Sequence, residues 1–285
     1  MLSAIQDLMK PPAGMAFDFS QPAGEPALSP ADGVSWRIFA NPIALFVGGV
    51  TAVLLELAEP SVRTGVWDHS SFQRDPQTRL KRTGFAAMMT VYGPRSAAEK
   101  LIGHVVRMHG HVQGETPDGT AYHANDPRLL DWVHATAAFG FTEAYHCYAQ
   151  HLSREEKDAS FAEGASSAQL YGAIGAPRSW AEWESLLAAT APGLEGSDIL
   201  ADFMRIMAQA KILPVPLRWL QRLLVRAAVA ITPEPVRSLP QLRGQGLRFG
   251  EATLVRLLAR AAALAPLGDT PPVQAARRLA AAPGA

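Results

Sequence analysis

Cysteine is nearly absent from this sequence, and its scarcity excludes several kinds of site. Cys147 is the only cysteine among 285 residues. A single thiol forms neither a disulfide within the chain nor a thiolate cage for zinc or an iron–sulfur cluster. We therefore expect Cys147 to be a small, buried, apolar side chain.

An excess of charge is missing as well. The 26 Lys and Arg residues balance the 26 Asp and Glu residues. Nucleic acid is therefore not an expected partner, because its phosphates require a positive stripe on the protein. The first 15 residues lack the basic region and long apolar run of a signal peptide, so we expect a cytoplasmic protein.

One apolar stretch, residues 43–58, resembles a membrane span in composition but not in length. It lies between Pro42 and Pro60, carries Glu56, and is shorter than the roughly 20 residues that a bilayer core requires. A helix that is apolar all round lies either in a protein core or in lipid. The length favours a buried core helix, with a membrane segment as the alternative, so no stable membrane span is expected.

Helix signals, in contrast, recur along the chain. Asn41, Asp75 and Asp126 each precede a proline, which is typical of a helix start, and Ser153 with Glu156 forms a capping box. No stretch alternates with period two, so strands are not expected. The sequence predicts an all-α protein of roughly 8 to 12 helices. We expect a loosely ordered arm (1–33), a single helical domain (34–270) and a C-terminal tail (271–285).

Two histidines lie on the apolar stripes of neighbouring predicted helices. His109 follows Ile102 and Val105 at helical spacing in the helix 96–112, and His134 lies on the apolar stripe of the helix 128–150. An inward histidine is either a neutral core residue with one hydrogen bond or a ligand of a cofactor held between helices. The pattern alone leaves both interpretations open.

Arg79 and Thr83 are four residues apart and share one face of the helix 77–92. A buried arginine needs an anionic partner, such as the propionate of a haem. The alternative is an ordinary surface arginine beside Lys81 and Arg82. Sequence motifs of zinc hydrolases, α/β-hydrolases and P-loop proteins do not occur in the chain.

An ordered set of motifs resembles the rubber-oxygenase/MpaB-type family, which includes the latex clearing proteins. The matching segments are GVWDHSSFQRDPQTRLKRT (65–83), VYG (91–93), VRMHGHVQG (106–114), AYHANDPRLLDWVHAT (121–136) and YHCYAQHLSREEKDA (145–159). The resemblance covers about residues 36–183 well and the later helices loosely. Each motif alone is weak, whereas the ordered set is fairly specific.

The resemblance implies a helical domain with a globin-like core and a b-type haem. It also implies that O₂ cleaves a carbon–carbon double bond in a small apolar, isoprenoid-like substrate. The family's R-x-x-x-T signature matches Arg79 and Thr83, and its proximal iron ligand matches His109. His134 is our expected second haem-facing group, and Phe85, Met88, Met89 and Phe141 are expected to line the substrate pocket.

This chain departs from the family pattern at one place. Such proteins often carry a histidine before the proline that ends the first long apolar helix, and this chain has Glu59 before Pro60. The latex-type catalytic acid has no clear match either. Fold does not fix activity, so two alternatives stay open: a haem-binding protein without oxygenase activity, or a non-catalytic helical interaction module. The sequence does not predict the oligomeric state.

Overall fold

The predicted helix starts are confirmed in the computed structural model, which describes residues 14–210, 215–265 and 268–281. The Asn41 side chain accepts hydrogen bonds from the backbone N–H groups of Ile43 and Ala44, at 3.1 and 3.0 Å. Asp75 caps its helix in the same way by accepting from the N–H of Thr78 at 3.1 Å. These contacts satisfy N–H groups that have no partner inside the helix.

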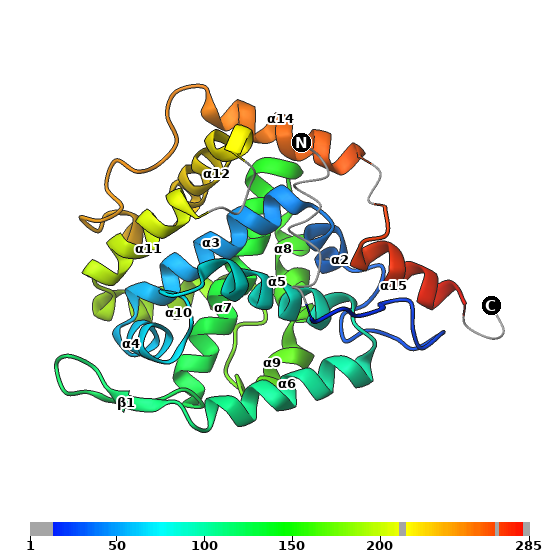
Figure 1. The fold of residues 1–285 in the computed structure, drawn as a ribbon, viewed down its shortest axis with the longest axis horizontal. Helices are drawn as coiled ribbons and strands as arrows, with labels where there is room; N and C mark the ends of the chain where they lie inside the picture. The colour runs from blue at the N-terminus through cyan, green and yellow to red at the C-terminus, as the bar shows by residue number, and fades with distance from the viewer. Residues whose placement is uncertain (1–13, 211–214, 266–267, 282–285) are drawn as a thin grey trace.

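The described residues form an all-α fold in a single domain, which confirms the predicted class. Figure 1 shows the helices α2 (Val34–Phe39), α3 (Pro42–Ala58), α4 (Pro60–His69), α5 (Pro76–Tyr92), α6 (Arg95–His109), α7 (Pro127–Ala144), α8 (Arg154–Glu163), α9 (Ala165–Tyr171), α10 (Trp180–Thr190), α11 (Asp198–Gln209), α12 (Arg218–Ile231), α13 (Glu234–Arg237), α14 (Glu251–Leu264) and α15 (Pro271–Ala280). The short helical turns η2 (Tyr145–Ala149), η3 (Ala191–Gly193) and η4 (Val215–Leu217) connect some of them.

Helix α3 is the centre of the core. It runs through the middle of the molecule and packs against α7 and α12 (Figure 1). Its backbone touches that of α7, since a Cβ added at Gly140 would lie 2.5 Å from the carbonyl oxygen of Gly48. In the described part of the chain, no single helix is long and apolar enough to cross a membrane. The pair α3 and α4 reaches that length only together, across a bend of 109°.

The expectation of no strands was wrong in one place. β1 (Gln113–Glu115) and β2 (Ala121–His123) form an antiparallel hairpin directly after α6, with Gly114 opposite Tyr122. Three residues are too few for period-two alternation to appear in the sequence. Tyr122 is buried, and its ring lies over Gly114, where a Cβ would come within 2.8 Å of the phenolic oxygen. The hairpin therefore fixes the chain at the end of α6.

The two ends of the described chain pack together, although the composition of residues 1–33 suggested a loosely ordered arm. Phe19 is 1% exposed, and its ring packs edge-on against Phe85 of α5. Arg278 of α15 is fully buried and donates to the backbone carbonyls of Phe19, Glu25 and Tyr92 at 2.6–2.8 Å. A composition rich in Pro and Gly disfavours regular structure, but it does not prevent packing. Residues 1–13 of the predicted arm and 282–285 of the tail lie outside the described residues.

Helix α7 ends in the π-helical turn η2 instead of continuing to Gln150. The backbone N–H of Leu152 donates to His146 Nδ1 at 3.0 Å, which ties the reversing chain to this turn. Cys147 lies here, half-buried, and its thiol donates to Glu143 Oε1 at 3.2 Å. Burial and the neighbouring carboxylate raise the pKa of Cys147 to about 12, which makes it an unreactive thiol at neutral pH.

Candidate cofactor site

His109 is the last residue of α6, and its direction is as predicted. Ile102 on the same stripe is 1% exposed, whereas His104 and His111 on the other face are exposed. The His109 imidazole is half-buried, and its Nδ1 atom is buried without a hydrogen-bond partner in the part of the chain that the structure describes. A buried imidazole nitrogen with no partner is costly in free energy unless another group contacts it.

Arg79 lies near enough to influence His109. Burial lowers the pKa of His109, and the positive charge of Arg79 lowers it further. The imidazole is therefore neutral at neutral pH, which is the form that binds a metal ion. Burial also lowers the pKa of Arg79, although the residue stays charged at any working pH.

Glu56 of α3 is the third member of this group, and the sequence analysis gave it no role. Burial raises the pKa of Glu56 to about 7, against the opposing effect of the positive charge of Arg79. Arg79 thus interacts electrostatically with both Glu56 and His109. We call these three residues the Arg79 cluster; they come from α3, α5 and α6. The sequence did carry one sign of a role for Glu56, because it is the only carboxylate in an otherwise apolar helix.

The guanidinium of Arg79 is half-buried and, within the described ranges, makes no hydrogen bond or ion pair closer than 4.0 Å. Buried guanidinium groups normally pair with carboxylates or phosphates. The Arg79 cluster therefore combines a cation that can take an anionic group with a neutral imidazole that can take a metal. In their chemistry these residues suit a haem, whose propionates would need the cation and whose iron would need the imidazole.

Thr83 does not join the cluster through a hydrogen bond. It is exposed, and its hydroxyl donates to the backbone carbonyl of Arg79 at 3.0 Å, within its own helix. A threonine side chain commonly makes this bond four residues back in a helix. The contact between Arg79 and Thr83 is thus a bond within one helix, and the Thr83 hydroxyl lies on the surface.

His134 faces inward as predicted, but toward another part of the protein. A Cβ added at Gly164, between α8 and α9, would lie 3.0 Å from His134 Nε2. Burial lowers the pKa of His134 to about 4, and no charge of the Arg79 cluster contributes to that shift. His134 is therefore a neutral histidine packed against the α8–α9 turn.

The departure at Glu59 has a structural explanation. Glu59 is buried, and its carboxylate accepts from the N–H of Val62 at 2.7 Å, which caps α4. Its second oxygen accepts from Arg128 of α7 at 3.1 Å. The carboxylate is fully engaged in joining α4 to α7.

The apolar residues expected to line one pocket belong to two cores. Phe85, Met88 and Met89 pack with Phe19 in a small core under the N-terminal segment. Phe141 instead packs on the main core, with its ring 4.6 Å from that of Phe39. The stripe on α5 is filled by the N-terminal segment, whose packing could not be read from the sequence.

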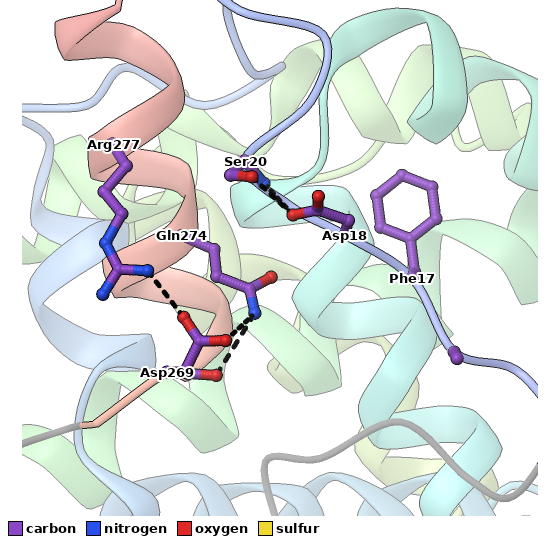
Figure 2. A pocket seen from close by; sticks show the side chains of 7 residues that line it. Phe17, Asp18, Ser20, Asp269, Gln274 and Arg277 are labelled. Carbon is purple, nitrogen blue, oxygen red and sulfur yellow. Dashed lines mark hydrogen bonds and ion pairs between the residues drawn. The ribbon is translucent and has the colours of Figure 1, made fainter.

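A surface hollow of about 550 Å³ lies elsewhere, between the N-terminal segment and α15 (Figure 2). Its lining includes Phe17, Asp18, Asp269 and Arg277, and Arg277 donates to Asp269 at 2.8 Å. No member of the Arg79 cluster lines it. Across the described segments, no group of three or more His, Cys, Asp or Glu side chains is arranged to hold a metal ion.

The fold and the cluster together describe an all-α protein in which a half-buried histidine and a half-buried arginine interact electrostatically. Residues 36–264 match the family model described as ER-bound oxygenase mpaB/B'/Rubber oxygenase, catalytic domain. The match covers more than half of the chain, so the chain belongs to this family of oxygenases. Searches of the curated proteins and of the solved structures gave no match.

Proposed function

We propose that this protein is a haem b-dependent oxygenase that uses O₂ to cleave a carbon–carbon double bond in a small apolar, isoprenoid-like substrate. The observation that carries the proposal is the half-buried imidazole of His109 beside Arg79, whose Nδ1 atom is buried without a hydrogen-bond partner among the described residues. Family membership supports the oxygenase class. The haem, the iron ligand and the substrate are our inference from the cluster.

In this proposal His109 is the iron ligand. Burial and the charge of Arg79 keep the imidazole neutral, so its lone pair is available at neutral pH. Nδ1 has no hydrogen-bond partner in the described chain, which leaves this nitrogen free to take one when the site is filled.

Arg79 holds a haem propionate through its guanidinium, which the described protein leaves without a close partner. Glu56 interacts with the same charge and, with a pKa of about 7, occurs in both its protonated and its ionised form near neutral pH. It is therefore able to give or accept a proton beside the cluster. Thr83 and His134 have other contacts and receive no role.

Haem, when bound, supplies the oxygen chemistry, and the protein supplies ligation, orientation and a dry surrounding. The overall reaction balances: both atoms of O₂ end in the two carbonyl groups formed from one C=C bond. The products of an isoprenoid are therefore an aldehyde and a ketone, and no external reductant is consumed.

Oxygen uptake with squalene as the probe tests this function. We expect the haem-loaded protein to consume one O₂ for each double bond cleaved, with ¹⁸O from labelled O₂ in both carbonyls. His109→Ala should lose at least 90% of the rate, whereas His104→Ala, on the exposed face of the same helix, should retain it. Haem-loaded protein that consumes no O₂ would instead support a haem carrier, sensor or peroxidase-like protein.

A further inference from the structure

Helix α14 lies at the outer edge of the molecule (Figure 1), and it presents apolar side chains to solvent. Val255, Ala259 and Ala262 are buried against the core, as expected for an amphipathic helix. The opposite face should then be polar. Instead it carries Leu257 and Leu264, which are 57% and 87% exposed.

The apolar surface extends beyond these two leucines. Leu254, one turn before Leu257, is 38% exposed, and Phe249, just before the helix, is fully exposed. Spacings of three and seven residues place the three leucines on one side of α14. The exposed apolar groups thus form a contiguous row and not isolated surface residues.

Positive charge accompanies this row. Arg256 and Arg260 are exposed on the same helix, and Arg248 is exposed just before Phe249. Arg256 donates to the backbone carbonyl of Cys147 at 3.1 Å, and the described residues place no carboxylate within 4.0 Å of Arg256 or Arg260. Glu251 is the only acidic residue between positions 239 and 264, and Arg226 binds it at 2.6 and 2.9 Å.

We propose that this surface docks on a membrane that contains anionic lipids. We call it the α14 face; it consists of Arg248, Phe249, Leu254, Arg256, Leu257, Arg260 and Leu264. Helices that lie in the plane of a membrane surface combine exposed Leu and Phe with Arg, and each cation adds attraction to anionic headgroups. With 14 residues, α14 is about 21 Å long, which suits lying on a bilayer and is too short to span one.

A second copy of the chain is a poorer occupant of the α14 face. A symmetric dimer would bring each arginine patch against its own counterpart. The segment 239–264 offers no free carboxylate to neutralise these charges, because Arg226 already binds Glu251. Anionic headgroups provide the missing charge.

Co-sedimentation with vesicles tests the docking surface. Wild-type protein should bind vesicles of phosphatidylcholine with phosphatidylglycerol, bind phosphatidylcholine alone at least tenfold more weakly, and be released by high salt. Leu257→Glu should lower binding at least tenfold. The matched control is Ile174→Glu, which places the same charge at a position that is 78% exposed and far along the chain from α14. It should bind as wild type does.

Circular dichroism should show that both variants fold, because both positions are exposed. Wild-type protein that stays in the supernatant with anionic vesicles would overturn the proposal, as would equal losses in the two variants. Sedimentation velocity gives the competing result: a concentration-dependent dimer that Leu257→Glu abolishes would assign the α14 face to a second copy. The α14 face and the Arg79 cluster share no residue, so failure of one proposal leaves the other intact.

Discussion

Glu56 is the only charged residue in helix α3, and its surroundings hold its proton unusually tightly. Its pKa of about 7 is well above its ordinary value of 4.5, because burial disfavours the carboxylate more than Arg79 favours it. Between pH 4.5 and 7 the folded protein therefore binds more protons here than the unfolded chain does. Through that window, the Glu56 contribution to the free energy of unfolding falls as the pH rises.

Glu56→Gln should remove this pH dependence. We expect the stability of the variant, relative to wild type, to increase by about 1 to 3 kcal/mol between pH 5 and pH 8, because glutamine cannot ionise. Urea unfolding at the two pH values measures the difference. Glu99→Gln, at an exposed glutamate on α6 with a solvent-facing partner in Arg95, is the control and should show no such change. If the stability difference between Glu56→Gln and wild type is the same at both pH values, the carboxylate is not buried as described.

The direction of His109 could be predicted from the sequence, whereas its electrostatic partners could not. Helical spacing alone places His109 on the stripe of Ile102, and the structure confirms this. The influence of Arg79 on Glu56 and His109 depends on how α3, α5 and α6 pack, which no local pattern encodes. The same reason explains His134: its stripe is apolar, but the stripe faces α8 and α9.

Among the elements, α3 and α7 approach each other so closely that their backbones are in contact. A Cβ at Gly140 would also lie 3.1 Å from the backbone nitrogen of Ala52, in addition to its 2.5 Å approach to the Gly48 carbonyl. Neither neighbour can move away like the end of a flexible side chain, because both are backbone atoms of a buried helix. Glycine at position 140 therefore sets the distance between the two helices.

Gly140→Ala should destabilise the protein by about 2 to 3 kcal/mol, since the added methyl group overpacks the interface. Gly84→Ala in α5 is the matched control: a Cβ there meets no atom of the described residues within 4 Å. That substitution should stabilise the protein by about 0.5 to 1 kcal/mol through helix propensity. Thermal unfolding of both variants compares the signs. Equal effects of the two substitutions would mean that the helices can separate at no cost.

Helix starts were predictable because a cap is a local arrangement of a few residues, as at Asn41, Asp75 and Ser153. The elements that the sequence missed depend on distant contacts or are very short. The hairpin has only three residues in each strand. The turn η2 is held by a hydrogen bond from the backbone N–H of Leu152 to the His146 side chain. Neither leaves a periodic signal.

At the scale of the whole molecule, segments outside the family match are built into the fold. The N-terminal segment and α15 lie outside residues 36–264. Arg278 of α15 donates hydrogen bonds both to the N-terminal segment and to the last residue of α5. Helix α5 also carries Arg79. The family region thus receives a further layer on one side, which its own sequence pattern does not reveal.

The visible absorption spectrum of the purified protein, expressed with ample haem and recorded before and after dithionite, tests the central claim most directly. The account predicts a Soret band that moves on reduction, is unchanged in His104→Ala and is lost or displaced in His109→Ala. A colourless wild-type protein that takes up no haem would contradict it and favour a helical interaction module. An unaltered band in His109→Ala would contradict the assignment of His109 as the iron ligand.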